Sequence, residues 1–364
     1  MAKNSGNIDW LILLAVVALM LFSVAFVYSA SSAVASAKFG SSEKLFWNHA
    51  FRVLGALVIM IVMAKIDYHH IREFTRPLMV VAILFLLYVF VGGDKAKGAV
   101  RWVHFGFINF QPSELAKFAI LIHISRILSD KKEKVLSFKE GLIPPLVWMG
   151  IVCGLIALQP NLSTAFVIFM LSFSLLFLSG AKVWQLAGLG IVGFVMAAIY
   201  AIGAEYRLNR LLAYINAPGS EDSPVNYQLQ QALIAFGNGG IVGVGPGQSY
   251  QRDLFLPEPF GDFIFSIVGE EYGYTGVLAV VMVFVIILWR GIIAARTAKD
   301  SFGFFLASGI TLTLSVYAFV NAGVTCGILP TTGLPMPFIS YGGTSVIFSA
   351  AAVGILLNVS SQKK

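Results

Sequence analysis

The chain has 364 residues, of which 58% are hydrophobic and 12% are charged, and its net charge is +7. A soluble protein has about 25% charged residues, so the composition indicates a membrane-embedded protein. The basic residues are scattered between apolar runs, which excludes a nucleic-acid partner and is typical of topology signals. The two cysteines lie in or beside apolar stretches and the five histidines lack zinc-ligand spacing, so no disulfide or metal site is expected.

Apolar runs recur along the whole chain, and about 20 apolar residues suffice to cross a bilayer. The first run has an alternative interpretation as a signal peptide, with a cleavage site near Ala37, but a first span is simpler because further spans follow. We therefore expect an all-α polytopic membrane protein with about ten transmembrane helices in a single integral membrane domain, residues 1–364. The expected spans are 9–30, 46–66, 76–93, 113–128, 142–159, 162–180, 183–203, 272–292, 303–326 and 341–359.

The fourth span is the weakest, because it is short and contains Glu114 and Lys117. With ten spans and both termini in the cytoplasm, cytoplasmic segments hold about twice as many of the 25 Lys and Arg residues as outer segments do, as the positive-inside rule requires. Omitting the fourth span would place the basic loop 129–140 outside. The charge distribution therefore supports this span and cytoplasmic N- and C-termini.

A large extracytoplasmic loop, residues 204–262, is expected between the seventh and eighth spans. Within it, residues 227–236 have the pattern of an amphipathic helix. The glycine-rich residues 237–247 lack the Gly-Lys-Ser/Thr ending and the preceding strand of a nucleotide-binding loop. They predict a flexible turn whose backbone approaches a ligand closely.

Asp262 ends this loop, directly before an apolar helix. One interpretation is a helix N-cap, since an Asp side chain satisfies free N–H groups there. The other is a general base, because a carboxylate beside Phe260, Phe263 and Phe265 is partly desolvated, which raises its pKa toward a useful range. Both roles can coexist.

Other charged residues also have two interpretations. Glu114 and Lys117 lie three residues apart on one helical face, and predict either a structural ion pair or a role in a substrate cavity. Arg207 and Arg210, like Arg101, are outer cations that either reach lipid headgroups or bind a pyrophosphate. Pro and Gly residues are dense in 321–345, so non-helical backbone is expected there, lining a cavity or buried in protein.

These motifs resemble the SEDS family (FtsW, RodA and SpoVE), polytopic peptidoglycan glycosyltransferases, over nearly the whole chain. The Thr331-Thr332 pair resembles the FtsW branch more than RodA. Five ordered blocks carry the resemblance: GAVRW (98–102) with QPSELAK (111–117), QPNLST (159–164), YR and Arg210 (206–210) with YQ and the glycine-rich stretch (227–247), LPEPFGDFIF with GEE (256–271), and NAG to SYGG (321–343).

The resemblance implies a SEDS-type helical bundle in which Asp262 is the catalytic aspartate and Glu114 and Lys117 line a central cavity. Two departures stand out. Phe260 and Gly261 replace the family's His-Thr, and the second block has Asn161 where the family has an aspartate. The implied substrate-binding residues are Arg101, Gln111, Glu114, Lys117, Arg207, Arg210, Gln228, Ser340 and Tyr341.

The implied function is inverting polymerisation of lipid II into β-1,4 glycan strands during septal cell-wall synthesis, at the outer face of the cytoplasmic (inner) membrane. Asp262 would deprotonate the acceptor hydroxyl, while arginines or a divalent cation (Mg²⁺ or Mn²⁺) stabilise the pyrophosphate. The implied partners are a class B penicillin-binding protein transpeptidase and other divisome membrane proteins. The alternatives are a lipid II flippase, a RodA-type elongation polymerase and a non-catalytic division scaffold.

Overall fold

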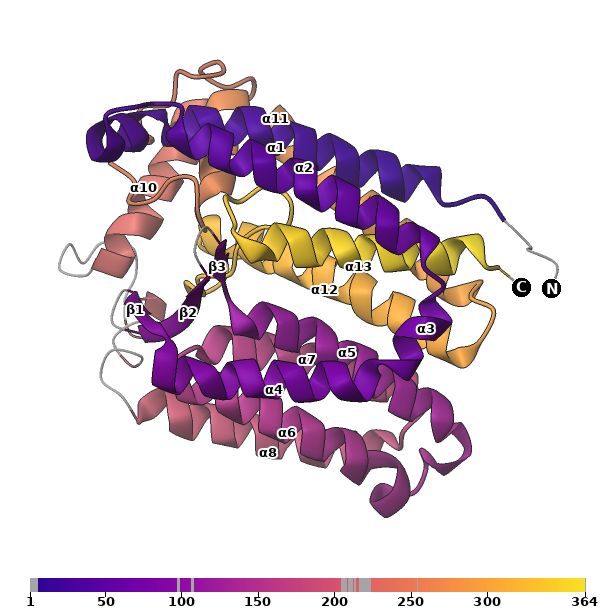
Figure 1. Cartoon of the computed structure of the whole chain (residues 1–364). Coiled ribbons are helices and arrows are strands. Elements are labelled where there is room, and N and C mark those ends of the chain that lie inside the picture. Colours follow the sequence, from indigo (N-terminus) through magenta and orange to yellow (C-terminus); the bar gives the residue numbers. More distant parts are fainter. Residues whose placement is uncertain are drawn as a thin grey trace.

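The computed structural model is a helical bundle with a small antiparallel sheet, β1–β2–β3, at one end (Figure 1). It describes residues 6–96, 99–105, 108–203, 208, 212, 214–215, 224–253 and 255–363. The helices are α1 (Trp10–Phe39), α2 (Lys44–Lys65), α3 (Tyr68–Glu73), α4 (Thr75–Gly92), α5 (Pro112–Asp130), α6 (Ile143–Leu158), α7 (Leu162–Leu178), α8 (Val183–Ile202), α10 (Pro224–Gly239), α11 (Ile264–Arg296), α12 (Ser301–Thr325) and α13 (Thr344–Ser361). The strands are β1 (Asp94–Ala96), β2 (Ala99–Phe105) and β3 (Ile108–Phe110).

Each of the ten expected spans coincides with a helix, and the prediction of a multi-pass all-α membrane protein is confirmed. Eight described helices are long and apolar enough to cross a membrane by length and composition. The apolar helix α7 is shorter, and α5 is not among the eight, so a count of ten spans stays a prediction. α11 begins at Ile264, earlier than the predicted 272, because its first turns contain the buried Glu270 and Glu271, which hydropathy places outside a span.

Two hydrophobic cores lie side by side. One joins α1, α2, α11, α12 and α13, and the other joins α4, α5, α6, α7 and α8. Helices α5 and α12 contribute to both cores, and Figure 1 shows α12 and α13 between the α1–α2 pair above and α4 below. In α12 and in α13, 72% of the most apolar 18-residue stretch is buried inside the protein, whereas in α8 only 11% is buried. Helix α8 therefore faces mainly outward.

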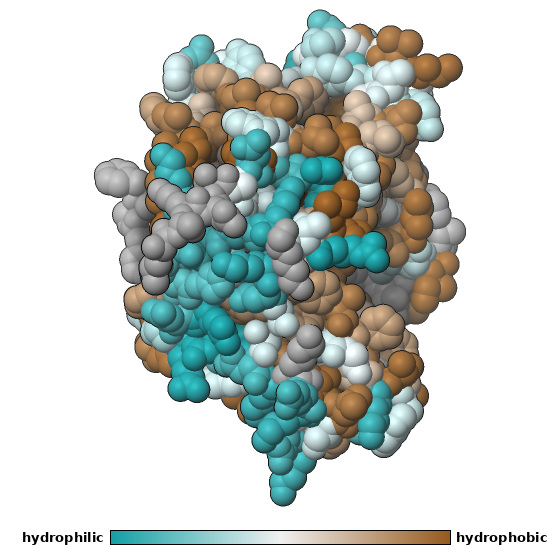
Figure 2. All heavy atoms as spheres, turned by 90° about the vertical axis from the view of Figure 1, so that its right-hand side faces the viewer, coloured by the Kyte–Doolittle hydropathy of each residue, from teal (hydrophilic) through white to brown (hydrophobic). Residues whose placement is uncertain are grey.

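The two ends of the bundle differ. The N- and C-termini and α3 lie at one end, while the sheet, α10 and the start of α11 lie at the other (Figure 1). Ala298, in the α11–α12 connection, pairs with Lys363, which places that connection at the terminal end too. Figure 2 looks onto the terminal end, where hydrophilic side chains gather over the centre and the lower part, with hydrophobic ones mainly above and to the right.

The glycine-rich stretch packs against a break in α11. Gly273 has φ 63° and ψ −162°, which interrupts the helix. Loop amides of Val244 and Gly245 donate to carbonyls just before the break, and loop carbonyls accept from amides just after it. A Cβ on Gly243 would lie 2.2 Å from the Glu271 carbonyl oxygen. The close backbone approach seen here is to α11, and the predicted approach to a ligand stays a prediction.

Two buried acids fasten this loop. Glu270 accepts hydrogen bonds from Asn238 at 2.9 Å and from the Gln251 amide at 3.2 Å, and also from the Ser249 hydroxyl. Glu271 accepts from Ser29 of α1 at 2.5 Å, and Arg252, which follows the glycine-rich stretch, donates to the same Ser29 hydroxyl at 2.9 Å. Because buried carboxylates are costly unless hydrogen-bonded or paired, these contacts fix the loop firmly against α1 and α11.

Candidate active site

Asp262 lies in the loop immediately before α11, at the end of the bundle away from the termini. Its backbone carbonyl accepts a hydrogen bond from the Asn321 side-chain amide at 2.7 Å. The same amide donates to the Leu334 carbonyl at 2.8 Å. Asn321 is buried in α12, so one side chain joins the Asp262 loop to the Pro- and Gly-rich segment before α13.

The carboxylate of Asp262 points toward that segment. A Cβ built on Gly333 would lie 3.4 Å from Asp262 Oδ2. The N-cap of α11 is Phe263, one residue beyond the position that the N-cap interpretation assigned to Asp262. Phe263 and Phe265 are buried and Phe260 and Asp262 are partly buried, and the role of Asp262 as a general base stays a prediction.

Buried polar atoms without a partner lie in the same region. Within the described part of the chain, Asn321 Oδ1, Thr331 Oγ1 and Thr332 Oγ1 have no hydrogen-bond partner. A bound water, ion or ligand can satisfy such atoms. The two threonines are the pair that resembles the FtsW branch, so this feature of the sequence falls beside Asp262.

Through Phe260, Tyr341 connects the loop that carries Asp262 to Arg52, a cation outside the predicted set of site residues. The Tyr341 amide donates to the Phe260 carbonyl at 2.8 Å, and their rings meet edge to face at 5.5 Å. The Arg52 guanidinium of α2 lies 5.1 Å from the Tyr341 ring centroid. In the sequence, Arg52 is an isolated charged residue inside an apolar span. The only signal for it is the general rule that charged residues within membrane spans are functional.

Arg52 also lines a pocket of about 280 Å³ between α2, β3 and the start of α13. Phe51, on the same wall, is 67% exposed, so the pocket opens on the outward face of α2. The cation and two side-chain amides provide donors for an anionic group. The lining residues are Asn48, Phe51, Arg52, Gly55, Asn109, Gly343 and Ile347.

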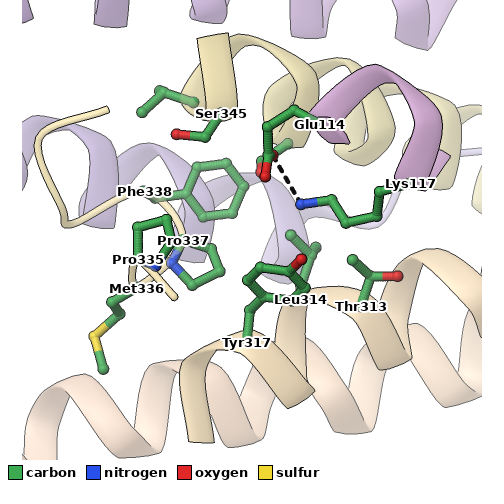
Figure 3. Close-up of a pocket in the computed structure, with 12 residues that line it drawn as sticks. Glu114, Lys117, Thr313, Leu314, Tyr317, Pro335, Met336, Pro337, Phe338 and Ser345 are labelled. Carbon is green, nitrogen blue, oxygen red and sulfur yellow. Dashed lines mark hydrogen bonds and ion pairs between the residues drawn. The ribbon is translucent and has the colours of Figure 1, made fainter. Parts of the chain in front are cut away.

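Glu114 and Lys117 form a buried ion pair in α5 (Figure 3), with Lys117 Nζ 2.8 Å from Glu114 Oε2. Lys117 Nζ also lies 4.1 Å from the Tyr317 ring centroid. The cavity beside this ion pair is small, because Pro335 and Phe338 occupy its other side. The volume that the centre of a water molecule can reach is about 10 Å³. That space holds about one water, so this conformation contains the structural ion pair, and a substrate-cavity role stays a prediction.

The remaining predicted residues are spread around this end of the molecule. Arg101 donates to the Gln159 carbonyl at 3.3 Å and to the Pro160 carbonyl, at the α6–α7 junction. Ser340 Oγ accepts from the Met336 amide at 2.9 Å. The Gln111 backbone amide donates to the Thr344 hydroxyl at 3.3 Å. Gln228 is half-buried on α10, and this helix packs on α11. Arg207 and Arg210 lie outside the described residues.

Metal-binding side chains do not cluster in the described structure, where no group of three or more His, Cys, Asp or Glu could hold an ion.

Comparisons with known proteins agree with this architecture over its full length. The FtsW/RodA/SpoVE family model, described as cell cycle protein, matches residues 9–364. The chain is 41% identical over 364 residues to the probable peptidoglycan glycosyltransferase FtsW of Geobacter metallireducens, covering 100% of this chain and 97% of that protein. It is 35% identical over 366 residues to stage V sporulation protein E of Bacillus subtilis, covering 99% of each.

A solved structure has the same fold. One chain of a peptidoglycan synthase complex, described as showing structural coordination of polymerization and crosslinking, has a TM-score of 0.80 and 26% sequence identity, covering 97% of each chain. The predicted resemblance is therefore confirmed, and the chain belongs to the FtsW/RodA/SpoVE family of cell cycle proteins.

Proposed function

We propose that this chain is a peptidoglycan glycosyltransferase that polymerises lipid II into β-1,4 glycan strands during septal wall synthesis. The observation that carries the proposal is the setting of Asp262, whose loop is held by Asn321 beside unpaired polar atoms of Asn321, Thr331 and Thr332. A carboxylate near unpaired hydroxyl and amide groups suits a sugar substrate. The names of the full-length relatives support the same activity.

The orientation follows from charge. The distribution of Lys and Arg favours cytoplasmic termini, and Asp262 lies at the opposite end of the bundle (Figure 1). Asp262 therefore faces the outer side of the cytoplasmic membrane, together with the described part of the predicted 204–262 loop.

The reaction joins two lipid-linked saccharides. Asp262 takes the proton of the acceptor hydroxyl as its oxygen attacks the anomeric carbon of the donor. The bond from that carbon to the pyrophosphate oxygen breaks on the opposite face, which inverts an α linkage to β. Undecaprenyl pyrophosphate leaves with the bonding electron pair. General-base assistance of this kind contributes about 10²- to 10⁴-fold.

The leaving pyrophosphate needs positive charge. Arg52 is the described cation that is joined to the Asp262 loop through Tyr341, and its pocket opens toward the outward face of α2. The pyrophosphate of a lipid-linked substrate that enters from the membrane would reach Arg52 while the lipid tail still lies among the helices. Arg101, Arg207, Arg210 or a divalent cation would add to this charge stabilisation.

Crosslinking requires a separate enzyme, and we propose a class B penicillin-binding protein as the partner. The likeness to a chain of a peptidoglycan synthase complex supports such an assembly. Other divisome membrane proteins would join this pair at the septum.

The test compares Asp262→Asn with Asp253→Asn in purified full-length protein supplied with lipid II. Asp253 is an exposed carboxylate of the same loop, so its variant controls for loss of negative charge. We expect no glycan polymer from Asp262→Asn and normal polymer from Asp253→Asn, while both proteins keep the wild-type melting temperature. Polymer of normal length from Asp262→Asn disproves the base role.

A lipid II flippase is the second candidate, favoured by the buried Glu114–Lys117 pair. The cavity beside the pair holds about one water, which is far too small for a disaccharide. Translocation of fluorescent lipid II by the purified chain in liposomes separates the two functions, since polymerisation alone requires Asp262.

A further inference from the structure

A second pocket lies away from the candidate active site, among α7, α11 and α12. Its volume is about 510 Å³, within the usual range for ligand-binding sites. The walls are mainly apolar, with aromatic side chains from α7 and α12. The lining residues are Phe173, Ser174, Phe177, Leu178, Ile292, Ala295, Arg296, Phe304, Ser308, Thr311 and Leu312.

The position of this groove confines it to one half of the membrane. Its residues belong to the last turns of α7, the last turns of α11 and the first turns of α12, which meet at the terminal end of the bundle. The α12 wall, from Phe304 to Leu312, rises about 12 Å at 1.5 Å per residue. That is less than half of a hydrocarbon core of about 30 Å.

Arg296 is the one cation among the described residues that line the groove. Arg296 is exposed in the last turn of α11 and has no ion-pair partner among the described residues. Arg290, earlier in the same helix, instead pairs with Asp9 at 2.6 Å. Deeper in the groove, the Thr311 hydroxyl is buried and has no hydrogen-bond partner within the described structure. The groove is thus apolar along its walls and cationic at the membrane surface.

We propose that this groove binds an anionic phospholipid of the cytoplasmic leaflet. One acyl chain lies along Phe173, Phe177 and Leu312, and the phosphate meets the Arg296 guanidinium, which suits bidentate contact with phosphate oxygens. The positive charge of Arg296 favours an anionic headgroup. The cytoplasmic leaflet is the one rich in anionic lipids. The assignment of leaflet depends on the proposed orientation and not on catalysis by Asp262.

The test is native mass spectrometry of the full-length protein in detergent, with phosphatidylglycerol or phosphatidylcholine added. We expect Arg296→Gln to weaken phosphatidylglycerol binding by roughly three- to tenfold, the value of a charged hydrogen bond at a partly exposed site. Phosphatidylcholine should be little affected. Lys65→Gln is the control, since it removes a cation from the last turn of another helix at the same end.

A second variant tests the groove itself. Ser174→Trp fills the α7 wall without altering charge, and should lower the binding of both lipids. Equal losses from Arg296→Gln and Lys65→Gln would show a general surface attraction and overturn the proposal. Unchanged binding in Ser174→Trp would also overturn it, as would a photocrosslinker at position 174 that captures a protein helix instead of lipid in native membranes.

Discussion

The Asn321 side-chain amide donates to the backbone carbonyl of Asp262 at 2.7 Å. Its second hydrogen bond, to Leu334 at 2.8 Å, makes this amide the link between the proposed base and the segment that carries Thr331 and Thr332. The position of Asp262 is therefore set from α12, which lies in both hydrophobic cores.

Replacing Asn321 with alanine should slow polymerisation while the protein stays folded. The change leaves two carbonyls unpaired and lets the Asp262 loop shift, and a shift of about 1 Å costs on the order of 10²-fold in rate. We expect kcat for lipid II polymerisation to fall by roughly ten- to hundredfold. A variant with normal kcat and a lower melting temperature would show that Asn321 supports only the fold.

Arg52 is predicted to bind the donor pyrophosphate. Arg52→Gln should lower kcat/KM for lipid II on the order of tenfold, the value of a charge-assisted hydrogen bond. Lys44→Gln is the matched control, because Lys44 is an exposed cation of the same helix. If both variants lose activity equally, the effect is general attraction of an anionic substrate and not binding at the Arg52 pocket.

The Glu114–Lys117 pair can be assigned by comparing single and double variants. Lys117→Met leaves Glu114 buried without a partner, which should destabilise the protein by about 3–5 kcal/mol. Glu114→Gln combined with Lys117→Met removes both charges and should recover most of that stability. We expect polymerisation to recover with it, as measured by thermal unfolding and product length. Recovered stability without recovered polymer would assign the pair to the substrate cavity.

Gly273 is predicted to tolerate no side chain. Its φ of 63° disfavours L residues, and a Cβ there would lie 2.4 Å from the Gly243 amide nitrogen. Gly273→Ala should therefore lower stability by about 2 kcal/mol or more. Gly188→Ala is the control in thermal unfolding, since Gly188 lies within α8 with no atom near the added methyl group. Equal melting temperatures would contradict the crowding at the break.

Much of the fold could be predicted from sequence because apolar run length and charge distribution are local signals. The approximate positions of the ten expected spans and of Asp262 followed from such patterns and from the family motifs. The start of α11 at Ile264 did not, because its first turns contain two glutamates that hydropathy places outside a membrane. Their burial depends on Asn238, Ser249 and Ser29, which are distant along the chain.

The candidate site was predictable only in part, for the same reason. Asp262 and the threonine pair are adjacent to motifs, but Arg52 meets Tyr341 through packing of α2 on α13, which no local pattern encodes. Arg101 was predicted to bind phosphate from its charge and outer position. Its described contacts with the Gln159 and Pro160 carbonyls depend on where the α6–α7 turn lies, which the sequence does not specify.

The break at Gly273 divides α11 into a short segment next to Asp262 and a long membrane-crossing segment. The glycine-rich loop is hydrogen-bonded to both segments. Val244 and Gly245 contact the short segment, and Gly240 and Ile241 contact the long one. A force applied to the long segment therefore reaches the acid through the loop as well as along the helix axis. A membrane neighbour that tilts this segment would therefore shift the proposed base without touching it.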